Sequence, residues 1–258
     1  MSRISGISST TPYLYGHIAS ANKLMSAADG AAELAITEKE KAQITGYNTG
    51  TKNLSDGVSL LNTSDSALGS VTGYLQRMRE LALQASNTAT MNSTNRANIQ
   101  KEIDQLKQGI EKVATQTNFN GMNLLDGSMS NGVQLVANAD NTMTVNNASS
   151  STLQALGIAD FDVTKNFDLQ SIDNALDKVT SNRSTLGAQS NLLDHAIDYN
   201  EYASVNLTAS MSRMADTDVS KTLMELKHQQ TLQSITMMLQ KQKMSQQGQK
   251  MSGLLMFN

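Results

Sequence analysis

Cysteine and tryptophan are both missing from this 258-residue chain, and proline occurs once. The lack of cysteine excludes disulfide bonds, thiolate metal sites and thiol nucleophiles together. Aromatic residues make up only 4% of the sequence, although large aromatic side chains usually dominate globular cores and enzyme pockets. We therefore expect no deep, rounded core. The apolar residues are mostly Leu, Ile, Val, Met and Ala, which suit seams between helices.

Charge and hydropathy argue against two further classes of protein. The formal net charge is −3, so charge does not suggest a nucleic-acid binder. The sequence contains no apolar run of about eighteen residues, so we expect no membrane span. Residues 1–20 also lack an apolar block of signal-peptide length. If the protein leaves the cell, we expect export without a cleaved signal of the usual kind.

Catalytic and metal-binding patterns are also missing. The three histidines, His17, His195 and His228, lie far apart, and no HExxH, GxxxxGK[ST], GxGxxG or GxSxG motif occurs. We interpret Asp194 and Asp198 as a solvated helix face rather than paired catalytic carboxylates. The methionine-rich tail could hold copper, but an adaptable packing surface is the interpretation we adopt. The sequence therefore predicts a protein that is not an enzyme and has no cofactor.

A seven-residue spacing of apolar residues is the strongest pattern and covers residues 36–86. Its seam positions are Tyr47, Leu54, Leu61, Leu68, Leu75 and Ala82. Such spacing keeps one stripe of a helix facing a partner over several heptads. Five glycines lie in the same stretch, and each costs up to ~1 kcal/mol relative to Ala. Asp65 and Arg79 also interrupt the second seam position. Packing rather than helix propensity must therefore hold this helix.

A second helix is predicted at about 93–114, after a loop at 87–93. Its apolar stripe consists of Ile99, Ile103, Leu106, Ile110 and Val113. The short connection and matched stripes predict an antiparallel helical hairpin. The sequence QTNFNGMNLLDG at 116–127 then closes the helix, because Asn and Gly tolerate the left-handed conformation of a helix terminus. We expect Phe119, Leu124 and Leu125 to fold back onto the seam.

Residues 128–168 change character and are rich in Ser, Asn, Asp and Thr. Two alternating runs, at 133–137 and 142–146, flank a turn signal and predict a small β-hairpin. Residues 151–157 are expected to add one helical turn.

A third long helix is predicted at roughly 170–214. Its seven-residue series consists of Ile172, Val179, Leu186, Leu193, Leu207 and Met214. A final helix should run from about 219 to 245, with Leu223, Leu226, Ile235 and Leu239 among its apolar residues. Residues 219–258 contain five Lys and a single Glu, and the seam is sparse. We therefore expect this tail to become ordered only against a partner.

These patterns together predict a mainly α protein. Its N- and C-terminal long helices should form an elongated antiparallel helical bundle or coiled coil with a small β-hairpin region. The dipeptide Thr11-Pro12 is typical of a helix start.

Several segments, in this order, resemble those of bacterial flagellin. The segments are LMSAADGAAELAI (24–36), NLSDGVSLL (53–61), LQRMRELALQ (75–84), QKEIDQL (100–106), QTNFNGMNLLDG (116–127), NRSTLGAQSNLLD (182–194) and NLTASMSRMADTDVSKTLMEL (206–226). Each motif alone is weak, but their order at both ends of the chain is specific, and the resemblance covers about four-fifths of the sequence.

The resemblance implies a structural subunit that self-assembles into the flagellar filament for motility. It also implies a domain arrangement. Residues 1–35 and 215–258 would form the filament-core helix domain. Residues 36–214 would form a rod-like helical domain with a β-hairpin segment at 128–168. Because only about forty residues separate the helical halves, the chain is similar to a short flagellin that lacks the outer variable domains.

The resemblance also implies partners and a location. Other flagellin subunits would be the main partner, and the protein would be secreted into the extracellular filament through the flagellar secretion apparatus. A flagellar export chaperone would bind the C-terminal helix first, at a tail that includes Leu223, Leu226, Ile235 and Leu239. The family's contact residues for Toll-like receptor 5 match Arg77, Leu81 and Glu102, of which Arg77 and Glu102 would share one side of the helical hairpin. An intersubunit contact or an ordinary exposed ion pair is the alternative interpretation.

Two other functions remain open at this point. The hook–filament junction protein shares paired terminal helices, although the NFNGMNLLDG and RSTLGAQSNLLDH segments favour flagellin. The chain also starts about a dozen residues later than typical flagellins, so the core-lining N-terminal helix is expected to be short. A secreted paralogue that no longer polymerises but still binds a receptor would fit that expectation.

Overall fold

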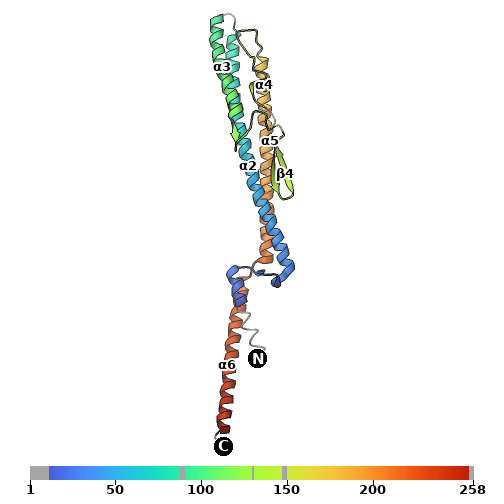
Figure 1. Cartoon of the computed structure of the whole chain (residues 1–258), viewed down its shortest axis with the longest axis vertical. Helices are drawn as coiled ribbons and strands as arrows, with labels where there is room; N and C mark the ends of the chain where they lie inside the picture. The colour runs from blue at the N-terminus through green and yellow to red at the C-terminus, as the bar shows by residue number, and fades with distance from the viewer. Residues whose placement is uncertain (1–11, 88–90, 130, 147–149, 256–258) are drawn as a thin grey trace. The chain divides into compact units, whose positions relative to one another are not determined.

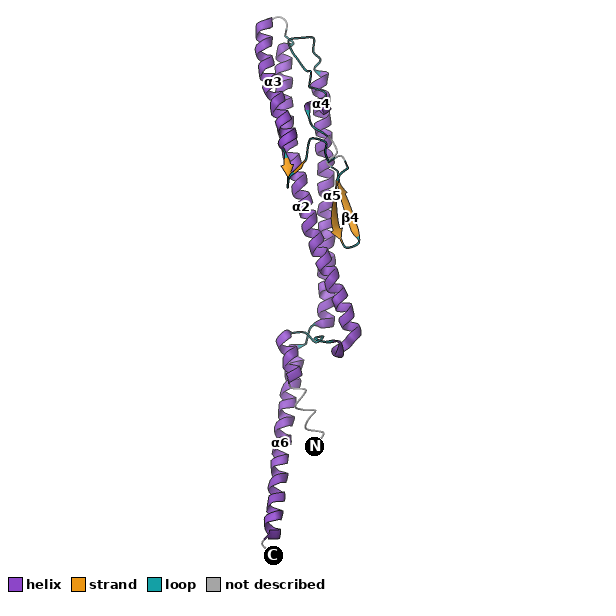
Figure 2. Cartoon of the chain, viewed as in Figure 1, coloured by secondary structure: helices purple, strands orange, loops and turns teal. Residues whose placement is uncertain are grey.

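The computed structural model describes residues 12–87, 91–129, 131–146 and 150–255. Long helices dominate it (Figures 1 and 2). They are α2 (Ala27–Ala85), α3 (Ser93–Gln116), α5 (Gln170–Ala215) and α6 (Val219–Leu255), with a short α4 (Leu153–Leu156). The strands form two small antiparallel pairs, β1–β2 and β3–β4. The predicted mainly α fold is therefore confirmed.

Two helices extend beyond their predicted bounds. Helix α2 begins at Ala27 rather than 36, with an interruption at Gly30, whose backbone is extended. Helix α6 continues to Leu255 rather than ending near 245. No proline follows Pro12, and a glycine such as the exposed Gly248 is tolerated inside a helix at a modest cost. The predicted helix start at Thr11 lies outside the described residues, while residues 12–20 are helical.

Contacts divide the chain into two units, which we describe separately. One unit consists of residues 1–42 and 206–258, and the other of residues 43–205. The domain boundaries predicted from the sequence, after residues 35 and 214, differ from these. We refer below to the terminal unit and the central unit.

Helices α2 and α5 run antiparallel in the central unit. Three polar contacts join them: Arg79–Asp173 at 2.6 Å, Arg183–Asp65 at 2.8 Å and Ser204–Asn48 at 2.9 Å. The residue number rises along α2 as it falls along α5, which sets the direction. Helix α3 packs against α2, where Arg77 meets Glu102. Asp65 and Arg79, which interrupt the apolar spacing, are therefore the residues that pair with the neighbouring helix.

The core of the central unit follows the seven-residue spacing. All six predicted seam leucines are no more than 3% exposed: Leu54, Leu61, Leu68, Leu75, Leu186 and Leu193. They belong to one buried cluster, which α3 joins through Ile103 and Ile110. Burial of a leucine side chain stabilises a fold by about 1.5–3 kcal/mol, so this seam outweighs the propensity cost of the glycines in α2.

The two strand pairs follow α3. β1 (Asn118–Phe119) pairs with β2 (Met122–Asn123), and this pair was not predicted. Asn120 and Gly121 adopt positive φ values of 50° and 78° in the turn between them, as Asn-Gly commonly does in two-residue hairpins. Helix α3 ends at Gln116, in the stretch predicted to close it, but its cap is the extended Thr117. Contrary to the prediction, the left-handed Asn and Gly therefore turn the hairpin and do not terminate the helix.

The predicted β-hairpin is the second pair. It consists of β3 (Val133–Asn138) and β4 (Asn141–Val145), with an irregularity in register between Val136 and Asn138. Leu124 and Leu125, which precede it, are fully buried. In Figure 1 the hairpin lies beside α5, and the contacts below show what holds it there.

Short contacts hold the terminal unit together. Asn22 and Asp216 form an isolated antiparallel bridge. Beside it, the Lys23 amide donates to the Ala215 carbonyl at 2.7 Å, and the Thr217 amide donates to the Ala21 carbonyl at 2.9 Å. The N-terminal segment and the link between α5 and α6 are thus joined by main-chain hydrogen bonds.

Candidate interaction surfaces

Helix α6 exposes an unusual amount of apolar surface. Its large apolar residues between 38% and 73% exposed are Val219, Leu223, Met224, Leu232, Ile235, Met237, Met238, Leu239 and Met244. Of the four apolar tail residues predicted to bind a partner, only Leu226 is buried, at 4% exposed. We call the exposed set the α6 apolar surface. Exposed apolar residues that gather on one element mark an interaction site more often than scattered ones do.

The α6 apolar surface occupies more than one side of the helix. At 3.6 residues per turn, Met237 and Met244 share a side with the buried Leu226. Leu232, Ile235 and Leu239 lie on the opposite side. Apolar residues on opposite sides of a helix can be buried only by neighbours on both sides. The arrangement therefore fits a helix packed among several neighbours better than one lying on a single flat surface.

The N-terminal segment covers only part of α6. Gln230 Nε2 donates to the Tyr15 hydroxyl at 3.0 Å. A hollow of about 440 Å3 remains nearby, lined by Tyr13, Leu14, Met224, Glu225, His228 and Gln229. Contact within the single chain thus leaves most of the α6 apolar surface exposed.

Asp29 anchors the N-terminal segment at the start of α2. The Tyr13 hydroxyl donates to Asp29 Oδ1 at 2.6 Å, and the amides of Met25 and Ser26 donate to Asp29 Oδ2 at 2.9 and 2.7 Å. The hydrogen bond from Tyr13 is the main cause that lowers the pKa of Asp29, and the same bond raises the pKa of Tyr13. Asp29 therefore holds the N-terminal segment when its carboxylate is charged.

The predicted receptor residues do not form one exposed patch. Arg77 Nη2 lies 2.8 Å from Glu102 Oε1, and its Nη1 lies 3.0 Å from Glu80 Oε2. The hydrogen bond to Glu102 is the main cause that raises the pKa of Arg77. All three side chains are exposed, whereas Leu81 is only 3% exposed and belongs to the core. The structure thus corrects the placement of Leu81, because a buried side chain has no surface to offer a receptor.

A buried amide and a glycine fix the hairpin against the helices, and sequence reasoning missed both. Asn200 on α5 is 1% exposed, and its Nδ2 donates to the Ala137 carbonyl at 2.7 Å. Gly50 on α2 lets the same strand approach, because a Cβ at this position would overlap the Ala137 oxygen. Two signals were available: Asn200 is the polar gap between Leu193 and Leu207, and Gly50 lies seven residues before Gly57.

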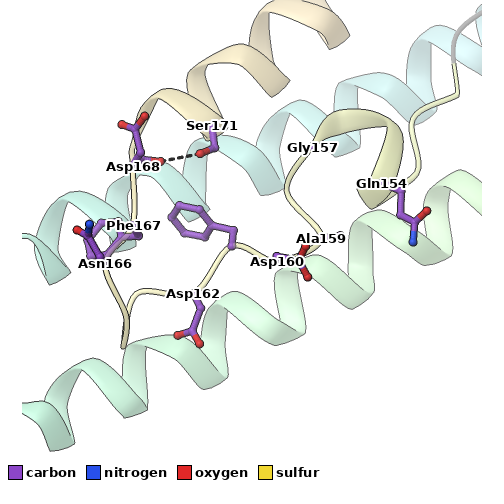
Figure 3. Close-up of a pocket in the computed structure, with 10 residues that line it drawn as sticks. Gln154, Gly157, Ala159, Asp160, Asp162, Asn166, Phe167, Asp168 and Ser171 are labelled. Atoms are coloured by element: carbon purple, nitrogen blue, oxygen red, sulfur yellow. Dashed lines mark hydrogen bonds between the residues drawn. The ribbon is translucent and has the colours of Figure 1, made fainter.

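A polar hollow of about 490 Å3 lies between α4 and the start of α5 (Figure 3). Its lining includes Asp160, Asp162 and Asp168, but these carboxylates point in different directions. Within the described ranges, no group of three or more His, Asp or Glu side chains is arranged to hold a metal ion. None of the helices in these ranges is long and apolar enough to span a membrane.

The chain is similar to several known proteins. A family model described as the bacterial flagellin N-terminal helical region matches residues 15–130, and one for the C-terminal helical region matches residues 169–248. The flagellin of Bacillus subtilis (strain 168) is 35% identical over 262 residues, covering 87% of this chain and 86% of that relative. The flagellin of Halalkalibacterium halodurans is 38% identical over 215 residues, covering 81% and 78%. The crystal structure of Bacillus cereus flagellin is 34% identical, covers 58% of this chain and 88% of that one, and aligns with a TM-score of 0.49.

Proposed function

Since this chain belongs to the bacterial flagellin family, whose members are structural proteins rather than enzymes, we propose that it is exported and polymerises with copies of itself. The family makes it a structural component of the flagellar filament, which lies outside the cell. Other flagellin subunits are its main partner. The polymerising segment in this proposal is α6 together with the N-terminal helical residues.

The exposed α6 apolar surface is the observation that carries this proposal. Each Å2 of apolar surface removed from water contributes about 25 cal/mol, so large exposed Leu, Ile and Met side chains favour association. The surface lies on opposite sides of one helix, so a single partner face cannot cover it. Contacts that repeat from copy to copy without closing a ring build a filament, and they would surround α6 on several sides.

Deletion of residues 219–258 tests the polymerisation proposal. We expect the shortened chain to fail to extend filament seeds, because it lacks the α6 apolar surface. Its central unit should unfold at an unchanged urea concentration, since the buried cluster uses residues 54–193 and partly buried neighbours up to Ile197. A milder full-length variant, Ile235→Ser with Leu239→Ser, should raise the critical concentration for assembly. Seeded growth of the shortened chain at the unmodified rate would overturn the proposal.

A flagellar export chaperone is the partner we propose for the chain before secretion. Inside the cell no filament covers α6, and the exposed Leu and Met side chains would otherwise favour aggregation. The chaperone and the filament would then compete for the same residues. Excess chaperone should raise the critical concentration for seeded assembly, and Ile235→Ser with Leu239→Ser should weaken chaperone binding. Chaperone binding that survives deletion of residues 219–258 would contradict this assignment.

Arg77 and Glu102 carry the proposed contact with Toll-like receptor 5. Exposed arginine is enriched among residues that dominate binding energy, and the ion pair with Glu102 holds the guanidinium in place. Leu81 supports this surface from below rather than touching a partner. We expect Arg77→Ala to weaken binding of the single chain to the receptor ectodomain by about tenfold or more.

Arg183→Ala is the matched control for the receptor test. Arg183 pairs with Asp65 at 2.8 Å and is similarly exposed, but it lies between α2 and α5 rather than between α2 and α3. This variant should bind the ectodomain like the unmodified chain. If the unmodified chain, Arg77→Ala and Arg183→Ala bound equally in a surface-plasmon-resonance titration, a receptor role for Arg77 would be contradicted.

A further inference from the structure

Four methionines stand out on α6 by their exposure. Met224, Met237, Met238 and Met244 are 65%, 56%, 73% and 64% exposed. In the core of the central unit, by contrast, Met78 is fully buried. The chain has no cysteine, so thioethers are its only sulfur groups. In the single chain, the thioether sulfurs of these four residues are therefore open to oxidants, and that of Met78 is shielded.

Packing alone does not require methionine at these positions. Leucine and methionine have similar volumes and usually exchange at a small cost, and the same helix carries several leucines. Methionine differs in its chemistry, because its thioether is oxidised to a sulfoxide that enzymes can reduce again. The sulfoxide converts a flexible apolar side chain into a polar one and disrupts methionine-rich interfaces.

We propose that Met224, Met237, Met238 and Met244 form a redox-sensitive modification site that controls assembly, with hydrogen peroxide as the oxidant. Each thioether sulfur donates an electron pair to one peroxide oxygen, and the O–O bond breaks. The proton of the first oxygen passes to the second, which leaves as water. The sulfur is oxidised to the sulfoxide and the peroxide is reduced. Oxidised chains join the filament only at a higher concentration. The inference rests on the proposed function, since it concerns the surface through which the chain polymerises.

The sulfoxide acts against burial of α6. Its oxygen accepts hydrogen bonds and is solvated in the single chain, but an apolar interface offers it no donor. Burial of a polar group without a partner opposes association. At 3.6 residues per turn, Met237 and Met244 lie on one side of α6 and Met224 and Met238 lie on another. Oxidation therefore affects contacts on both sides of the helix. Assembly would in turn cover the sulfurs, so existing filaments should resist the reagent that inactivates single chains.

Seeded assembly before and after peroxide treatment tests the inference with the full chain. Hydrogen peroxide is applied to single chains, and peptide mapping records the oxygen gained at each methionine. We expect oxidation at the four α6 positions before Met78, and a rise of about tenfold or more in the critical concentration. Reduction of the treated chain by methionine sulfoxide reductases A and B should return its critical concentration to the value before treatment. Filaments treated in parallel should gain less oxygen at the four positions.

Two variants separate the site from general damage, each compared with itself before and after treatment. In the variant M224L/M237L/M238L/M244L, the ratio of critical concentrations after and before peroxide should stay near one. In Met78→Leu the ratio should rise as in the unmodified chain. The inference would be overturned by an unchanged critical concentration after full oxidation of the four methionines, or by failure of the reductases to restore assembly. Neither result would contradict the proposal that the chain polymerises. If untreated chains do not extend seeds, the proposed function fails, and the inference fails with it.

Discussion

The Asn200 side chain places a buried amide in an otherwise apolar stripe of α5. Its Nδ2 lies 2.7 Å from the Ala137 carbonyl oxygen, at the irregular point of β3. Removal of one partner of a buried hydrogen bond leaves the other without a donor and costs about 1–3 kcal/mol. We expect Asn200→Ala to lower the free energy of unfolding by that amount, measured by urea unfolding of the full chain.

Asn53→Ala is the matched control for Asn200. The Asn53 Nδ2 also donates to a carbonyl of β3, that of Val136 at 3.1 Å, but at a more exposed site. Water can replace this hydrogen bond, so we expect a change of no more than about 0.5 kcal/mol. If both substitutions lowered the free energy of unfolding equally, burial of the Asn200 amide would not add to the stability that its hydrogen bond provides.

The hydrogen bond between Tyr13 and Asp29 makes the N-terminal anchor sensitive to acid. The pKa of Asp29 is lowered in the folded chain, so the anchor contributes stability above the unfolded value of about 3.9. That contribution is lost as the pH falls through the folded pKa. In Tyr13→Phe the carboxylate loses its main donor, and we expect the pKa of Asp29 to rise. A carboxyl NMR titration of both chains measures this, and an unchanged pKa would contradict the assignment.

At the scale of elements, two glycines of the same helix predict opposite effects. A Cβ at Gly50 would overlap the Ala137 oxygen, whereas nothing lies within 4 Å of a Cβ at Gly69. We expect Gly50→Ala to displace the β3–β4 hairpin and destabilise the central unit. Gly69→Ala should stabilise the same unit by up to about 1 kcal/mol, since alanine has the higher helix propensity. Thermal unfolding by circular dichroism compares them, and a shift of the same sign in both would contradict this account.

Periodicity in the sequence predicted the elements that rely on many repeated residues. The spacing from Leu54 to Leu75 indicated a long α2 and its seam, and that of Leu186 and Leu193 indicated α5. The β1–β2 pair was missed because two residues per strand carry no alternation, so that only Asn120-Gly121 signalled its turn. Helix α6 was predicted too short because its apolar residues become sparse, whereas nothing in the backbone ends it.

Contacts between distant segments explain what the sequence could not supply. Gly50 was counted as a cost to α2, although it creates the space in which β3 packs. Leu81 matched a family motif, but a motif records residue type and not exposure. Asn200 broke the apolar series of α5, and only the position of the Ala137 carbonyl reveals its purpose. Each of these residues depends on a partner far away in the chain.

At the scale of the whole molecule, the two units differ in how they bury apolar residues. The central unit has a continuous cluster that runs from Leu54 to Leu193 and includes the strand residues Ala137 and Val145. In the terminal unit, Leu226 is buried, and many other apolar side chains of α6 between residues 219 and 250 are exposed. In a single chain, the central unit is therefore well packed, whereas α6 has little tertiary packing. Polymerisation with other copies would supply the missing contacts of α6.

Hydrogen exchange of the α6 amides, compared between the single chain and the assembled filament, tests this account most directly. A helix with little tertiary packing opens at a small cost in free energy, whereas one in a core is protected up to the global stability. We predict rapid exchange across residues 227–250 in the single chain and exchange slowed by about a hundredfold or more in the filament. Amides of α2 between residues 54 and 75 should be protected in both forms. Equal protection of α6 in the two forms would contradict the claim that copies of this chain provide its packing.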